Sequence, residues 1–150
     1  MGLVLNRFAH VSVAEALSDI PNGLNSETPL FWGGPVQSEM VLALFRNEQD
    51  KRNGLRITRD LFLGNDLQDL LQQLQESAAS EEHLRVFAGY AGWGAGQLAC
   101  EMEENSWILT TAKSRLIFNT PVGSLWTRAM HELGPHYAFL ATMPEDPRVN

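Results

Sequence analysis

Cysteine and positive charge are both scarce in this 150-residue chain. The single cysteine, Cys100, cannot form a disulfide within the chain, so nothing in the sequence indicates an oxidising compartment. Only 11 Lys and Arg residues stand against 18 Asp and Glu residues, which gives a net charge of −7. Because proteins bind nucleic-acid phosphates through clustered cations, we do not expect this acidic chain to bind nucleic acid directly.

Long uncharged runs are absent as well. The longest stretch without Asp, Glu, Lys or Arg is Val86–Cys100, which is too short to cross a bilayer as a helix and is interrupted by four glycines. The opening residues Met1–Arg7 lack the basic lead and the apolar core of a signal peptide. We therefore expect no membrane association and a cytoplasmic location.

What the chain does contain is enough apolar material for one domain. Hydrophobic residues make up 44% of the sequence, and 150 residues is a common domain size. No repeat or linker-like tract divides the chain. Strand and helix signals intermix without regular alternation, which predicts a single compact domain over residues 1–150. Its expected class is α/β (mixed α+β), with a mixed β-sheet flanked by helices.

Three helices are predicted from residues that favour helix ends and from apolar spacing. The first begins with a capping box formed by Ser12 and Glu15 and stops at the next proline. The second carries a stripe of leucines at helical spacing after Asn65. The third has Thr120 as its N-cap and ends at Gly134, which is followed by a proline that cannot continue the helix.

Strands are expected where short apolar runs lie between turn residues. The run at residues 137–142 fits a strand and a helix equally well, and its periodicity does not decide between them. The expected strands are Gly2–Leu5, Val41–Phe45, Leu55–Thr58, Leu84–Tyr90 and Trp107–Thr111.

The most unusual segment places a glycine-rich turn between a buried strand and a helix that begins near Gly96. Free backbone N–H groups at such a turn can bind a phosphate or a carboxylate. The glycines match neither the dinucleotide-binding pattern nor a P-loop, and Trp93 stands where a nucleophile elbow needs serine. We favour the interpretation that the glycines permit positive φ and close packing. The candidate ligand- or partner-binding residues of this segment are Gly89, Tyr90, Gly92, Trp93, Gly94, Gly96 and Gln97.

A second glycine-rich turn is formed by Gly33, Gly34 and Pro35. The two glycines permit a sharp reversal and the proline fixes its exit, so a plain turn is the favoured interpretation. A ligand or partner could also meet the exposed backbone here, and these three residues join the list of binding candidates. We further hypothesise that the two glycine-rich turns converge on one cleft.

Catalytic and metal-binding motifs are not recognised in the sequence. His131 and His136 are one residue too far apart for a zinc-binding H-E-x-x-H motif, and a Gly-Pro pair lies between them. Cys100 is followed by several glutamates and is expected to be a packed core residue, although a pairing with a distant histidine stays open. We therefore expect no catalytic residues, no metal and no cofactor.

Four segments, spread over nearly the whole chain, are distinctive in combination. They are Gly2–Arg7, Gly33–Val36, Phe87–Leu98 and Phe118–Pro121, the last leading to Trp126. In content and order they resemble the AlgH/YqgE family of bacterial proteins. The resemblance implies a compact α/β domain with a mixed sheet, and it implies no established reaction and no catalytic set. Family members are often labelled transcriptional regulators, yet this sequence has no recognisable helix-turn-helix or basic recognition helix.

The sequence departs from the family pattern at several places. Phe8 stands where the family usually has proline after the Asn-Arg pair, and Ala99 and Cys100 stand where acidic residues are common. The usual N-terminal strand-forming segment is expected to be missing. Such a loss would leave a sheet edge open and would favour self-association through that edge.

Two functions follow as hypotheses from these observations. The favoured one is a non-enzymatic regulatory or adaptor domain that acts through a protein partner, since the chain is acidic and has no catalytic constellation. The alternative is a protein that binds, or is an enzyme acting on, a small anionic metabolite at the Gly89–Gln97 segment. Direct DNA binding is the least favoured hypothesis because of the net negative charge.

Overall fold

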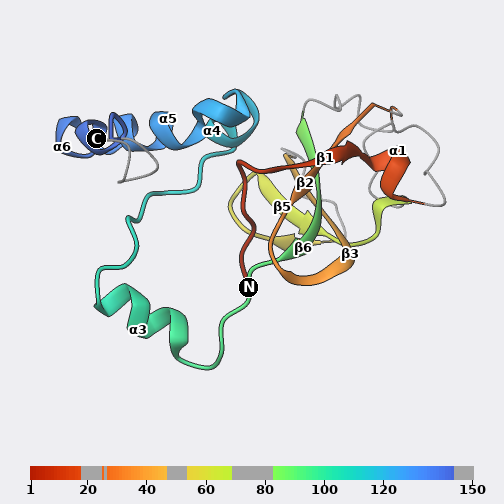
Figure 1. The fold of residues 1–150 in the computed structure, drawn as a ribbon, viewed down its shortest axis with the longest axis horizontal. Coiled ribbons are helices and arrows are strands. Elements are labelled where there is room, and N and C mark those ends of the chain that lie inside the picture. Colours follow the sequence, from red (N-terminus) through yellow and green to blue (C-terminus); the bar gives the residue numbers. More distant parts are fainter. Residues whose placement is uncertain (18–24, 26, 47–53, 69–82, 144–150) are drawn as a thin grey trace. The chain divides into compact units, whose positions relative to one another are not determined.

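The structure is a computed structural model that describes residues 1–17, 25, 27–46, 54–68 and 83–143 (Figure 1). Its contacts divide the chain into two compact units, Met1–Ile108 and Leu109–Asn150. The first unit contains the β-sheet, and the described part of the second is helical.

The described residues of the first unit form a six-stranded sheet with the strand order β1-β2-β6-β3-β5-β4. β2 and β6 run parallel, whereas the other neighbouring strands run antiparallel. The predicted α/β fold with a mixed sheet is thereby confirmed. The strands are β1 (Phe8–Ser12), β2 (Pro29–Trp32), β3 (Val36–Arg46), β4 (Leu55–Arg56), β5 (Leu61–Gly64) and β6 (Leu84–Tyr90).

β6 occupies an interior position of the sheet and has the bounds expected from the sequence (Figure 1). Phe87 pairs with Phe31 of β2 on one side and with Leu42 of β3 on the other. The first four residues of β6 are all buried, and because successive side chains of a strand point to opposite faces, β6 is covered on both faces at this end; the buried residues include the charged Arg85. β2 and β3 are consecutive in the chain, but β6 lies between them in the sheet.

The hydrophobic core lies on the sheet and the helix that follows its first strand. Val13, Phe45, Val86 and Phe87 are completely buried. The ring centroids of Phe45 and Phe62 lie 5.7 Å apart in a stacked arrangement. Burial of a phenylalanine side chain contributes roughly 1.5–3 kcal/mol, so these residues supply a large share of the unit's stability.

Helix α1 (Val13–Ala16) begins with the predicted capping box. The Glu15 backbone N–H donates to Ser12 Oγ at 3.2 Å, and the Ser12 backbone N–H donates to Glu15 Oε2 at 2.7 Å. The bond from the Ser12 backbone is the main reason why the pKa of Glu15 lies below its ordinary value. The helix is shorter than predicted, because Leu17 is already extended; Pro21 lies outside the described residues.

Two of the expected strands are wrong. Residues 107–111 form no strand, and of Gly2–Leu5 only Gly2 makes a bridge, to Ala91. Both segments are rich in apolar residues, which is why strands were expected, but neither pairs with a strand of the sheet over its length. The helix predicted after Asn65 is visible at Leu67 and Gln68, and its remainder lies outside the described residues.

The second unit contains a short 3-10 helix, η2, among three α-helices of its described part. The helix predicted from Thr120 actually begins at Leu125, because Pro121 is extended (ψ 137°) and a 3-10 turn follows it. Its end is confirmed, since Gly134 has a φ of 107° just beyond the last turn. The ambiguous run at residues 137–142 falls mostly in a helix. The elements are α4 (Ser114–Phe118), η2 (Val122–Ser124), α5 (Leu125–Glu132) and α6 (Pro135–Leu140).

No helix in the described ranges is both long enough and apolar enough to cross a membrane.

Candidate functional site

The N-terminal segment and the two glycine-rich turns meet at one end of β6. Gly2 and Ala91 exchange two backbone hydrogen bonds of 2.8 Å. The Gly33 N–H donates to the Ala88 carbonyl, and the Gly33 carbonyl accepts from the Val4 N–H, both at 2.9 Å. Three segments that are far apart in the sequence are thus joined here through their main chains.

The two turns converge, as hypothesised, but they do so through direct backbone contact. A Cβ atom added to Gly33 would lie 2.2 Å from the Gly89 carbonyl oxygen, and one added to Gly34 would lie 2.2 Å from the Tyr90 carbonyl carbon. Gly34 and Gly89 also have positive φ angles, 153° and 67°. The glycines are therefore needed for close approach of two main chains, which is the structural interpretation favoured above.

Beyond this contact the chain continues into a second glycine-rich stretch that leads to helix α3 (Gln97–Glu103). Gly96 is the N-cap of α3 and is left-handed, with a φ of 76°, so the predicted helix start is correct. The Gly94 N–H donates to Gln97 Oε1 at 3.0 Å, and the Gln97 N–H donates to the Gly94 carbonyl at 3.1 Å. The turn thus uses two of its N–H donors internally, which reduces what it can offer to an anion.

Glu101 on α3 is the centre of a polar network that holds this region together. Its Oε2 atom accepts hydrogen bonds from the indole N–H groups of Trp93, at 3.0 Å, and Trp107, at 2.9 Å. Gln97 Nε2 donates to the other carboxylate oxygen at 2.9 Å. The two indole rings lie edge to face with their centroids 5.8 Å apart. The bonds from Trp107, Gln97 and Trp93 hold the pKa of Glu101 below its ordinary value.

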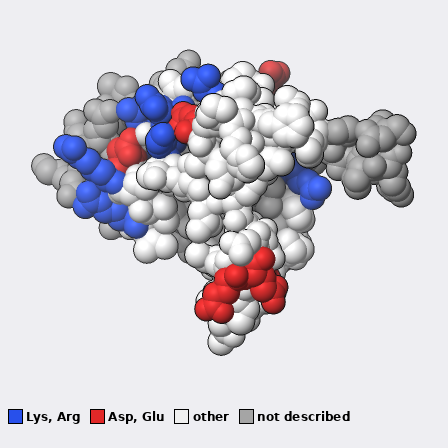
Figure 2. All heavy atoms as spheres, turned by 90° about the vertical axis from the view of Figure 1, so that its left-hand side faces the viewer, with Lys and Arg blue, Asp and Glu red and all other residues white. Residues whose placement is uncertain are grey.

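We define the α3 arm as residues 92–108, which comprise the turn, the helix and the segment after it. None of the α3 residues is buried. Large apolar side chains of the arm are exposed: Leu98 (36%), Met102 (43%), Trp107 (45%) and Ile108 (37%). The same helix carries Glu101 and Glu103, and Figure 2 shows acidic side chains gathered at the lower end of the view, where α3 lies in Figure 1. The arm therefore combines an apolar surface with negative charge.

Cys100 is exposed on the α3 arm, so the expectation of a packed core residue is wrong. Cys100 lies within helix α3, and no residue of that helix is buried. Among the described residues, no group of three or more His, Cys, Asp or Glu side chains is placed to hold a metal ion.

The other candidate residues fall into two groups. Gly33, Gly34 and Gly89 are buried in the contact between the turns, whereas Pro35 is exposed beside it. Tyr90 is half-buried at the end of β6. The remaining candidates belong to the α3 arm and are Gly92, Trp93, Gly94, Gly96 and Gln97.

Sequence reasoning missed Glu101 and Trp107, the two residues that organise the arm with Trp93. Glu101 entered the sequence analysis only as one of the glutamates that follow Cys100. Its spacing contains a usable signal, because Gln97 and Glu101 are four residues apart and therefore share a helix face. Helical spacing does not connect Trp107 with Glu101, because Trp107 lies beyond the end of α3.

Comparisons with known proteins agree with this combination of segments. A family model described as "DUF179: AlgH-like" matches residues 1–138. A UPF0301 protein from Chlorobium limicola is 33% identical over 150 residues, which is 100% of this chain and 79% of that protein. A UPF0301 protein from Cytophaga hutchinsonii is 32% identical, over 99% of this chain and 81% of that protein.

Two solved structures are similar to this one. The solution structure of the AlgH protein from Pseudomonas aeruginosa has a TM-score of 0.70 and 25% identity, and the match covers 97% of this chain and 78% of that chain. The crystal structure of protein DIP2367 from Corynebacterium diphtheriae has a TM-score of 0.76 at 21% identity, over 94% of this chain and 74% of that chain, and shows the shared fold. Because the family model matches residues 1–138 and a UPF0301 protein is 33% identical over 100% of this chain, the chain belongs to the AlgH-like (UPF0301) family.

Proposed function

We propose that this protein is a non-enzymatic regulatory or adaptor domain that binds a protein partner through the α3 arm. The observation that carries the proposal is the surface of the arm, where Leu98, Met102 and Trp107 are exposed together on a segment whose helix buries nothing. Aromatic residues and methionine are enriched at protein–protein interfaces, and grouped apolar side chains on a surface mark interaction sites.

The arm is also held in a defined shape before any partner binds. A seven-residue helix is far too short to be stable by its own backbone hydrogen bonds. Glu101 compensates, because its carboxylate joins the turn through Trp93 and the segment after the helix through Trp107. A surface that is already ordered loses less conformational entropy on binding, which favours affinity.

The charge of the arm indicates the chemistry of the partner. Glu103 and Glu104 lie at the end of α3, and both are exposed beside the apolar side chains. A complementary partner surface would present apolar side chains bordered by Lys or Arg, since complementary charge speeds association and selects the partner. We therefore expect a basic amphipathic protein segment.

The test compares two exposed methionines in the same chain. Met102 lies on the arm and is 43% exposed, whereas Met143 lies in the helical unit and is 52% exposed. A partner captured from native lysate is purified, and its dissociation constant is measured with the wild-type protein, Met102→Glu and Met143→Glu. We expect Met102→Glu to weaken binding at least about tenfold, because it places a charge in the apolar contact.

Met143→Glu serves as the control, since it adds the same charge outside the arm and should bind as the wild type does. Equal binding of all three proteins would overturn the assignment to the arm. Failure to capture any specific partner would count against an adaptor role altogether. Circular dichroism of each variant checks that the fold is retained.

A further inference from the structure

The helical unit contains a hollow that the proposed function does not use. Its volume is about 610 Å³, within the range of roughly 300–1,000 Å³ that is usual for small-molecule sites. Every lining residue belongs to α4, η2, α5 or the turn between them, so the hollow lies within one unit. The lining residues are Arg115, Leu116, Asn119, Thr120, Pro121, Ser124, Thr127, Arg128, His131 and Glu132.

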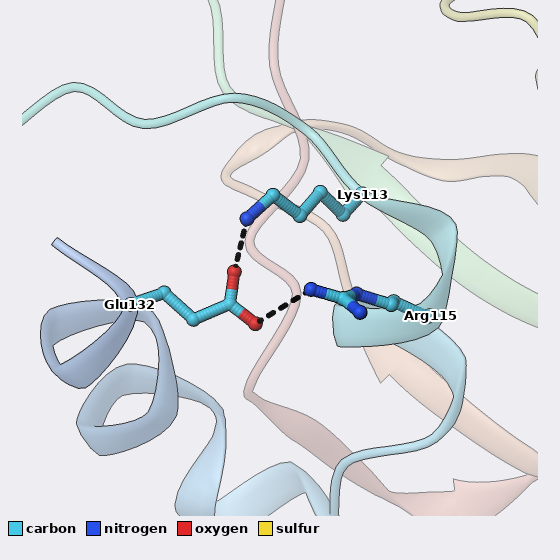
Figure 3. A network of polar contacts seen from close by, with 3 residues as sticks. All are labelled: Lys113, Arg115 and Glu132. Carbon is cyan, nitrogen blue, oxygen red and sulfur yellow. Dashed lines mark hydrogen bonds and ion pairs between the residues drawn. The ribbon is translucent and has the colours of Figure 1, made fainter.

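A carboxylate is already bound by cations at the edge of this hollow. Glu132 Oε2 accepts from Lys113 Nζ at 2.5 Å, and its Oε1 atom lies 3.9 Å from Arg115 Nη2 (Figure 3). The bond from Lys113 is the main reason why the pKa of Glu132 lies below its ordinary value, and the charges of Arg115 and Arg128 act in the same direction. The carboxylate is therefore ionised near neutral pH, and one negative charge is matched by Lys113.

The cations of the hollow exceed what Glu132 can neutralise. With Lys113 paired to Glu132, the guanidinium groups of Arg115 and Arg128 leave the lining with a positive charge, in a chain whose net charge is −7. The contact between Arg115 and Glu132 is long, and the Arg115 side chain is 72% exposed. Arg115 thus keeps most of its N–H donors available to a ligand.

The polar side chains of the lining are arranged by the period of α5. Arg128 and Glu132 are four residues apart, as are Thr127 and His131, so they form two adjacent rows on one side of the helix, and Ser124 is the N-cap residue at its start. Hydroxyl groups therefore accompany the arginine along the wall. This combination of guanidinium and hydroxyl donors is suited to an anion with several acceptor oxygens.

We propose that this hollow binds a phosphate group, supplied by a small phosphorylated metabolite or by free phosphate. Two guanidinium groups can each donate two parallel hydrogen bonds to phosphate oxygens, a geometry that lysine cannot reproduce. The two positive charges of Arg115 and Arg128 together match the two negative charges of a phosphate dianion. Leu116 and Pro121 provide apolar lining for the organic part of a phosphate ester. The segment Phe118–Pro121, one of the four that resemble the family, supplies Asn119, Thr120 and Pro121 to this wall.

The test uses nuclear magnetic resonance titrations of the full chain with adenosine monophosphate, inorganic phosphate, adenosine and succinate. We expect amide shifts at residues 115–132 with the two phosphates, weaker shifts with succinate and none with adenosine. Tighter binding of the ester than of the free ion would identify a metabolite as the source, and equal binding would identify free phosphate; both support a phosphate site. Absence of shifts with both phosphates overturns the proposal, as does equal binding of adenosine.

Charge-matched variants separate this site from general attraction of anions. Arg128→Gln and Arg115→Gln should each weaken phosphate binding at least about tenfold. Arg59→Gln is the control, because it removes the same charge from an exposed position in the other unit. If Arg128→Gln and Arg59→Gln bind phosphate equally well, the hollow is not the site. Circular dichroism confirms that each variant is folded.

Discussion

The two halves of the glycine-rich segment Gly89–Gly96 differ sharply in what surrounds them. Gly89 is pressed against the main chain of the other turn, and a Cβ there would lie 2.5 Å from the Gly34 carbonyl oxygen. At Gly96 no atom lies within 4 Å of an added Cβ. Both glycines have positive φ, so the same residue type allows close packing in one half and only a change of chain direction in the other. A glycine-rich motif alone therefore does not indicate a ligand site.

The largest effect should come from Gly34→Ala, which tests the packed half. The added Cβ would lie 2.2 Å from the Tyr90 carbonyl carbon, and the backbone there has a φ of 153°. Overpacking against a rigid main chain and positive-φ strain should together lower the free energy of unfolding by at least about 3 kcal/mol. Chemical denaturation measures the loss. Gly123→Ala, with open space around it, should change stability by less than about 0.5 kcal/mol.

A smaller effect is expected from Gly96→Ala, which tests the open half. No atom obstructs the new methyl group, so only the left-handed conformation opposes it. The cost should be about 1 kcal/mol in the same denaturation experiment. If Gly96→Ala lowered the free energy of unfolding as much as Gly34→Ala, the surroundings of Gly96 would be as tightly packed as the turn contact. The two halves of the glycine-rich segment would then not differ in packing.

The smallest effect concerns the protonation of Glu101. Hydrogen bonds from Trp107, Gln97 and Trp93 favour its ionised form and lower its pKa below the ordinary 4.5. The network thus stabilises the arm above that value and is lost as the pH falls through the lowered pKa. Tryptophan fluorescence should change in this acid range while far-ultraviolet circular dichroism stays constant.

Two variants show whether this change belongs to the network. Glu101→Leu has no carboxylate to titrate, and its fluorescence transition should disappear. Glu103→Leu removes an exposed neighbour on the same helix, and the transition should remain. Should Glu103→Leu abolish it instead, the indole groups would be reporting another carboxylate.

Local signals in the sequence predicted some elements correctly. The capping box at Ser12 and the left-handed Gly96 depend on residues within a few positions of each other. β6 was predicted with its bounds because Leu84–Tyr90 is a short, mainly apolar run bounded by turn residues.

Elements that depend on distant partners were missed. β1, β2 and β5 are strands because they pair with neighbours, and their short sequences do not identify those neighbours. Trp107 was assigned to a strand, although its indole N–H bonds a carboxylate on the preceding helix. The contact between Gly33 and Gly89 was anticipated only as a possible cleft, because close main-chain packing leaves no trace beyond the glycines themselves.

The place of β6 in the sheet has a consequence for synthesis of the protein. β1 and β2 form one group of paired strands, and β3, β5 and β4 form another; among the described strands, β6 alone connects them. Because β6 is the last of the six to leave the ribosome, β2 and β3 each carry an unpaired edge on the nascent chain until then. Such edges recruit strands from other chains, so premature termination before Leu84 should yield aggregation-prone fragments.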